Sequence, residues 1–141
     1  MAENPDKIDY RPIDYIIDVI VPAAEGEIGK GQVAINDRPA IIEILTHQII
    51  KTGLIYPNQA PQDGLYRIDF SLYETTRFFK GAVPMADAAY GSVRTGIWIP
   101  FRAPIIVAGS ETLHVAVQNM WGPRPAPFSV QVIFKGLERM V

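Results

Sequence analysis

The side chains of this sequence that could do chemistry are two histidines, four serines and a few paired carboxylates. No serine lies in the Gly-x-Ser-x-Gly elbow that exposes a nucleophile; the four are Ser71, Ser92, Ser110 and Ser129. His47 and His114 each fall within an expected strand, and neither has a second ligand type at metal-binding spacing. Both histidines are therefore expected to be structural.

Pairs of carboxylates could serve as general acid and base or could bind calcium. The pairs here are Asp14 with Asp18 and Glu25 with Glu27, and isolated pairs of this kind are common on solvated surfaces. The sequence contains no cysteine, which removes thiolate nucleophiles, disulfides and sulfur ligands for zinc. No catalytic residue and no metal site are expected.

Residues 29–34, Gly-Lys-Gly-Gln-Val-Ala, match the loose form of a dinucleotide-binding fingerprint. That motif needs a strand before it and a helix after it. Here a β-prone Gln-Val-Ala-Ile follows, so we expect a hairpin turn and no cofactor. A Walker loop is also absent, because Gly29-Lys30 is not followed by Ser or Thr. The sequence predicts a protein that is not an enzyme.

Aromatic residues in loops are the remaining candidates for function, because Trp, Tyr and Arg are enriched among interface hot spots. The candidate protein interface consists of Tyr10, Arg77, Phe78, Phe79, Trp121 and Arg124. Trp121 lies in a turn flanked by Pro and Gly, where an interface role and a packing role are equally expected. Trp98 lies in an apolar stretch, which favours a place in the core.

The elements that position these side chains are predicted to be short strands. Twelve prolines and eleven glycines divide the 141 residues into segments of about 5 to 10 residues, which is strand length. The chain is 48% hydrophobic and 20% charged, as expected for a packed globular domain. The sequence therefore predicts an all-β protein.

The first half of the chain contains an expected arm and two expected strands. Residues 1–14 contain Asn-Pro and Arg-Pro among charges and predict an extended arm. Residues 15–21 predict a strand, and residues 24–31 a loop or hairpin. Residues 40–50 are ambiguous: Ile41, Leu45 and Ile49 fit a helical stripe, whereas Ile42, Ile44 and Thr46 fit strand alternation. We favour the strand.

The middle of the chain predicts one strand, a long loop and an interrupted apolar segment. Residues 65–73 alternate, with Tyr66, Ile68, Phe70 and Leu72 on the core face. Residues 74–96 predict a long loop with one short helical turn as an option. Residues 98–107 are interrupted by two prolines, which predicts a sheet edge or two short strands.

The end of the chain has the clearest alternation. Residues 112–119 and 129–135 predict two antiparallel strands joined by a rigid Pro-rich loop. Six to eight short strands at this spacing indicate an antiparallel β-sandwich, with a jelly roll as the expected version. The expected organisation is an extended N-terminal arm, residues 1–14, and a single sandwich domain, residues 15–141.

Charge and hydropathy argue against several partners. The net charge is -2 and no run of five like charges occurs, so neither nucleic acid nor an anionic membrane surface is expected as a partner. No apolar run approaches the roughly 20 residues that span a bilayer. Residues 1–6 lack the features of a signal peptide, which, with the missing cysteine, predicts residence in a reducing cytosol.

Several segments together carry a family resemblance. They are Ala-Gly-Ser-Glu-Thr at 108–112, Leu-His-Val-Ala-Val-Gln-Asn at 113–119, Val-Gln-Val-Ile-Phe-Lys-Gly at 130–136, and Arg-Pro-Ala at 38–40 before the strand at 41–50. Residues 32–136, which include a second strand at 66–73, resemble the small cement or decoration proteins of tailed-phage virions, of the jelly-roll type found in podophages. Residues 1–31 depart from that pattern.

The resemblance implies a β-sandwich that binds the outside of a capsid between major capsid subunits and stabilises the shell. It also implies a dimer or trimer, synthesis in the host cytoplasm, location in the virion, and no catalytic residues. An alternative is a carbohydrate- or receptor-binding β-sandwich module of a virion or tail, with Trp121 as the expected sugar contact.

Overall fold

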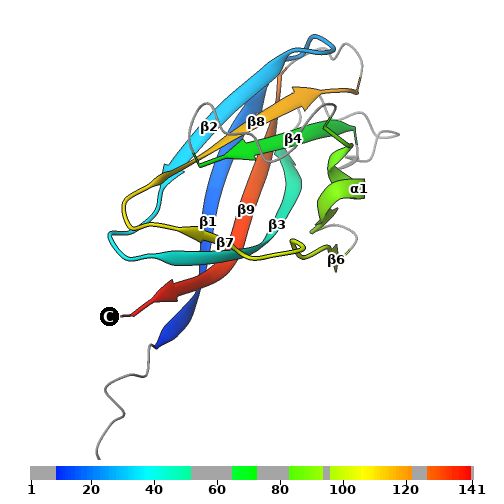
Figure 1. Cartoon of the computed structure of the whole chain (residues 1–141). Helices are drawn as coiled ribbons and strands as arrows, with labels where there is room; N and C mark the ends of the chain where they lie inside the picture. The colour runs from blue at the N-terminus through cyan, green and yellow to red at the C-terminus, as the bar shows by residue number, and fades with distance from the viewer. Residues whose placement is uncertain (1–8, 52–64, 73–82, 94–95, 122–126, 141) are drawn as a thin grey trace, which may run out of the picture.

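The computed structural model describes residues 9–51, 65–72, 83–93, 96–121 and 127–140. They form an all-β protein with two main antiparallel sheets (Figure 1). The four-stranded sheet has the order β1 (Tyr10–Val21), β9 (Phe128–Arg139), β3 (Ala40–Lys51) and β7 (Ile105–Val107). The three-stranded sheet has the order β2 (Ile28–Ala34), β8 (Thr112–Asn119) and β4 (Tyr66–Ser71). Helix α1 (Ala86–Tyr90) precedes a small pair, β5 (Gly91–Ser92) and β6 (Ile97–Trp98).

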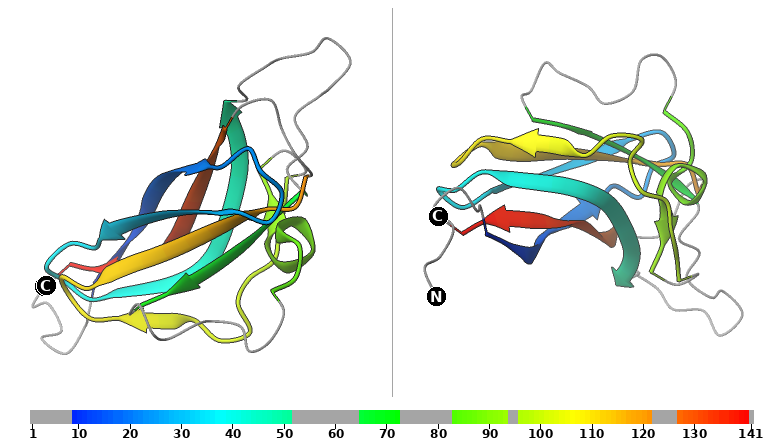
Figure 2. Two further views of the ribbon diagram at one scale, coloured as in Figure 1. Left: turned by 90° about the horizontal axis from the view of Figure 1, so that it is seen from above. Right: turned by 60° about the horizontal axis from the view of Figure 1, so that its bottom comes forward.

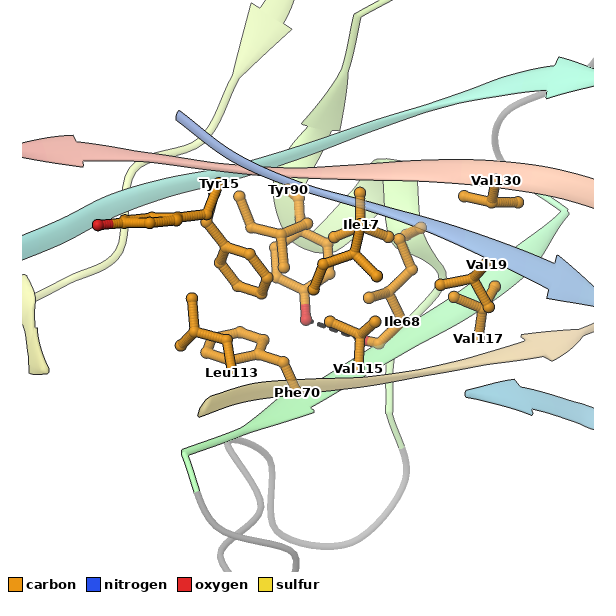
Figure 3. Packing of buried hydrophobic residues seen from close by; sticks show 14 of the residues in the cluster. Tyr15, Ile17, Val19, Ile68, Phe70, Tyr90, Leu113, Val115, Val117 and Val130 are labelled. Carbon is orange, nitrogen blue, oxygen red and sulfur yellow. Dashed lines mark hydrogen bonds between the residues drawn. The ribbon is translucent and has the colours of Figure 1, made fainter. Parts of the chain in front are cut away.

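The two sheets pack face to face around one hydrophobic core (Figure 2). Strand alternation explains the arrangement. Every second residue is buried along β4 and β8, along β1 from Tyr15 on, and along β9 from Phe128 to Phe134. In Figure 3, Ile17 and Val19 of β1 point toward Val115 and Val117 of β8. The sandwich is therefore held together by the inward faces of both sheets.

The strands pair in a nested order along the chain. β1 pairs with β9, β2 with β8, and β3 with β7, and all three pairs are antiparallel. Inside this nest, a single antiparallel bridge joins Arg67 of β4 to Met85. Further pairing of β9 with β3 and of β8 with β4 completes the two sheets. Consecutive long strands thus lie in alternate sheets.

Strands β1 and β2 lie against each other at one edge of the sandwich. A Cβ atom at Gly29 would collide with the main-chain carbonyl of Ile20, and one at Gly31 would meet side chains of Ile17 and Val19. These glycines therefore allow close approach of two backbones within strands. The hairpin turn expected for residues 29–34 is wrong, because these residues all belong to β2.

The opposite edge is covered by the segment from α1 to β6. The Tyr90 hydroxyl donates a hydrogen bond of 2.7 Å to the carbonyl oxygen of Ile68 on β4 (Figure 3). The Val93 amide bonds to His47 O of β3 at 3.1 Å, and Phe101 N bonds to Glu43 O at 2.9 Å. The residues from α1 to Phe101 thus connect β3 with β4, which lie in different sheets.

Several expectations about the elements are confirmed. The ambiguous residues 40–50 are a strand, β3, and the segment after residue 96 forms two short strands around the prolines. The short helical turn is present as α1. A register shift between Ile42 and Ile44 explains the ambiguity, because a bulge at this point changes which residues face the core.

Two expectations need correction. β1 begins at Tyr10, so residues 10–14 belong to the sheet and not to an arm; residues 1–8 lie outside the described part of the chain. The strands β8 and β9 do not pair with each other, because β8 lies between β2 and β4 whereas β9 lies between β1 and β3. Alternation identifies a strand but does not identify its neighbours.

Candidate interaction surface

The outer face of the four-stranded sheet carries exposed isoleucines. Ile16 and Ile20 of β1 and Ile106 of β7 are 50%, 70% and 74% exposed. The register places Ile16 beside Ile133 of β9, and Ile106 beside Ile41 of β3. We call these five residues the isoleucine face. The Ile16–Ile133 pair and the Ile41–Ile106 pair lie on the same sheet face, with Asp14 and Lys135 between them in the register. Large exposed apolar side chains on such a face are candidates for contact with a partner.

A row of polar side chains crosses this face. The amide nitrogen Nε2 of Gln48 donates to Oε1 of Gln131 at 2.8 Å, and Nε2 of Gln131 donates to Oδ1 of Asp18 at 3.3 Å. The three residues are cross-strand neighbours on β3, β9 and β1. The row fixes the orientation of these side chains, so the face is preorganised.

Trp98 lies next to this face and not in the core. It is 45% exposed, and the Nζ atom of Lys135 lies 4.9 Å from the centroid of its ring. Lys135 also forms an ion pair of 3.2 Å with Asp14 of β1. The expected core position of Trp98 is wrong, because its side chain is largely exposed and lies against the Lys135 ammonium group.

The isoleucine face was missed by sequence reasoning, although a signal for it was available. In residues 15–21 the buried positions are all apolar or aromatic, and two of the three positions between them, Ile16 and Ile20, are apolar as well. A strand with one solvated face normally alternates apolar with polar residues. Apolar residues on both faces of a strand predict that both faces are covered by protein.

The residues of the expected interface are not brought together where the structure describes them. Tyr10 is 43% exposed at the start of β1, opposite Arg139. Trp121 is half-buried and packs edge-on against Phe128, with ring centroids 5.7 Å apart. Phe128 is opposite Val21 at the other end of the same strand pair, so Tyr10 and Trp121 lie at opposite ends of the sheet. The other four expected interface residues, Arg77, Phe78, Phe79 and Arg124, lie outside the described residues.

His47 is fully buried between the two sheets. Its Nδ1 atom lies 2.5 Å from the Tyr66 hydroxyl, and its Nε2 atom lies 3.3 Å from Oδ1 of Asp87 on α1. A buried imidazole with these neighbours ties β3, β4 and α1 together and offers no access to a substrate. His114 instead lies on the outer face of the three-stranded sheet. Within the described ranges, no group of three acidic or imidazole side chains could hold a metal ion.

Glu138 holds together the ends of three strands. Its carboxylate is buried, accepts a hydrogen bond of 2.7 Å from Nδ2 of Asn36, and forms an ion pair of 2.7 Å with Arg11. The hydrogen bonds from Asn36 and Arg11, with the positive charges of Arg11 and Arg38, hold the pKa of Glu138 below its ordinary value. By contrast, burial raises the pKa of Tyr90 above its ordinary value.

The one helix that the structure describes is too short to cross a membrane. Comparisons of the chain with protein-family models, with curated proteins and with solved structures found no match.

Proposed function

We propose that this chain is a structural virion protein that binds the outside of a capsid between major capsid subunits and stabilises the shell. The isoleucine face is the observation that carries the binding part of the proposal, because it exposes large apolar side chains between rows of hydrogen-bonded polar side chains on one side of the sandwich. The resemblance of residues 32–136 to phage cement proteins supports the capsid as the partner.

The exposure of the isoleucines indicates that they contact a partner and do not stabilise the core of this chain. Ile20 is 70% exposed and Ile106 is 74% exposed, so most of their side-chain area contributes nothing to the core of this chain. Burying such a side chain in an interface contributes roughly 1.5–3 kcal/mol. Repetition over a capsid lattice strengthens individually weak contacts, because the bound copies act together. A surface of modest size is therefore sufficient for a cement protein.

We also propose that the sandwich is a jelly roll. A jelly roll is a long antiparallel hairpin rolled into two sheets, so its strands pair in a nested order. The pairs β1 with β9, β2 with β8 and β3 with β7 support this topology. The bridge between Arg67 and Met85 occupies the place of the fourth and innermost pair. A dimer or trimer belongs to the same proposal, and sedimentation equilibrium measures it.

The test uses virions and expanded capsids of the tailed phage whose genome encodes the chain. The double variant Ile16→Ser, Ile20→Ser removes two apolar contacts from the isoleucine face. Ile28→Ser is the matched control, because Ile28 is also 50% exposed but lies on the outer face of the other sheet. Binding to shells is measured by co-sedimentation of the purified protein.

We expect the double variant to bind shells at least tenfold more weakly, and Ile28→Ser to bind as the unmodified protein does. Absence of binding by the unmodified protein contradicts the proposed function. Equal loss of binding in both variants contradicts the assignment of the isoleucine face.

A further inference from the structure

The outer face of the three-stranded sheet has a hollow centred on Ala116 of β8. The register places Ala116 between Lys30 of β2 and Asp69 of β4. The next outward residue, His114, lies between Gln32 and Ser71. These six residues are among the described residues that line an open pocket with a volume of about 670 Å³. Ala116 has the smallest of the six side chains, and the other five are polar.

The dimensions of the hollow follow from sheet geometry. Neighbouring strands lie about 4.8 Å apart, so the β2 wall and the β4 wall are separated by roughly 10 Å. Residues two apart on one strand are separated by roughly 7 Å, which sets the distance between the two polar rows. The volume lies within the range of about 300–1,000 Å³ that is typical of small-molecule sites. One or two sugar rings fit such a space.

The walls present complementary hydrogen-bonding groups. Lys30 donates only and the carboxylate of Asp69 accepts only, while Gln32, His114 and Ser71 can do both. Oδ1 of Asp69 accepts a hydrogen bond of 2.9 Å from the Phe70 amide, which orients the carboxylate. A ligand that can donate and accept hydrogen bonds on all sides matches this set of side chains. Hydroxyl groups both donate and accept hydrogen bonds, so a ligand with several hydroxyl groups has this property.

Other ligand classes fit less well. An α-amino acid carries its two charges on groups bonded to the same carbon atom, whereas Lys30 and Asp69 lie on strands separated by β8. A phosphate or another anion would be repelled by the negative charge of the Asp69 carboxylate. We propose that the hollow around Ala116 is a binding site for an uncharged saccharide. The site lies on the sheet opposite the isoleucine face, so the proposal does not depend on capsid binding.

This site differs from the sugar contact that the sequence suggested. Trp121 packs against Phe128 beyond the end of β8 and is not among the residues that line the hollow. The described lining contains no exposed aromatic ring on which a sugar could stack, because Phe70 points into the core. The expected affinity is therefore weak, with a Kd of about 1 mM.

The test is a titration of ¹⁵N-labelled protein with maltose, cellobiose, lactose and N-acetylglucosamine, followed by backbone amide shifts in NMR spectra. We expect at least one of these sugars to shift the amides of Gln32, Asp69 and Ala116 in a saturable way. Ala116→Phe fills the hollow and should abolish the shifts. Ala34→Phe is the control, because it places the same ring on β2 outside the hollow.

A second variant keeps the test independent of how well Ala116→Phe folds. Lys30→Met removes the ammonium group but retains the apolar stem, and it should weaken saturable binding at least threefold. Absence of localised shifts with all four sugars overturns the proposal. Unchanged binding by both Ala116→Phe and Lys30→Met overturns it as well.

Discussion

Gly29 lies directly against the main-chain carbonyl of Ile20, so the two sheets touch through their backbones at this edge. A side chain at position 29 would force β2 away from β1 and would open the core beside Val19. The close approach thus depends on the absence of a single Cβ atom.

Gly29→Ala should lower the free energy of unfolding by about 1–3 kcal/mol, because the added methyl group has no space. The midpoint of urea denaturation measures the change. Lys30→Ala on the same strand is exposed and should change stability by no more than about 0.5 kcal/mol. Equal stability of Gly29→Ala and the unmodified protein would show that β1 and β2 are not in contact.

Glu138→Gln should make the stability of the protein depend less on pH between neutral and acid conditions. The pKa of Glu138 is held below its ordinary value of 4.5, so between the two values the unfolded chain binds more protons than the folded protein. The carboxylate therefore contributes stability above pH 4.5, and this contribution is lost as the pH falls through the folded-state pKa. Melting temperatures of both proteins, measured from neutral to acid pH, should differ at neutral pH and converge in acid.

Glu25→Gln provides the comparison for this experiment. Glu25 is exposed in the turn between β1 and β2, whereas Glu138 is buried against Arg11 and Asn36. The melting curve of Glu25→Gln should follow that of the unmodified protein at every pH. A Glu138→Gln difference that persists unchanged in acid would mean that the glutamate acts through shape and not through charge.

Tyr66→Phe should destabilise the protein by about 1–3 kcal/mol. It removes the hydroxyl that lies 2.5 Å from Nδ1 of the fully buried His47, and a buried polar atom without its partner is costly. Tyr15→Phe is the matched control, because the Tyr15 hydroxyl only accepts a long bond of 3.4 Å from the Asn36 amide. Chemical denaturation of the two variants should rank Tyr66→Phe as clearly less stable.

Asn119→Leu should also cost about 1–3 kcal/mol, although leucine has a similar size. The Asn119 side chain is buried, and its Nδ2 atom donates to the carbonyl oxygens of Pro22 and Ala23, both at 3.1 Å. Its Oδ1 atom accepts from the Trp121 amide at 2.8 Å. Leucine has no amide group, so these main-chain groups lose their hydrogen bonds to the side chain. Faster hydrogen exchange at the Trp121 amide would locate the effect, and unchanged exchange would contradict it.

The sequence was sufficient to predict the strands but not their neighbours. Alternation identified β4 with its buried face, and it favoured a strand at residues 40–50. The pairing of β8 with β2 depends on contacts between residues far apart in the sequence, such as Gln118 and Ile28, which are 90 positions apart. No local pattern encodes such a partner, because side-chain periodicity repeats identically for any register that keeps the same face inward.

The candidate surfaces were harder to predict. Gly29 and Gly31 indicated a turn, because a close approach between two strands and a tight turn both favour glycine. Trp98 was predicted to lie in the core because it is a large apolar residue in an apolar stretch, but its side chain is largely exposed. The hollow around Ala116 combines residues from three strands and becomes visible only when the register is known.

The central position of β9 has a consequence for synthesis. This strand lies between β1 and β3, yet residues 128–139 leave the ribosome about 80 residues after β3. Until then β1 has no partner in its sheet, and its apolar residues are exposed on both sides. Folding must wait for contacts of very long sequence separation, which makes it slow. A nascent chain stalled before residue 128 should therefore be a target for chaperones.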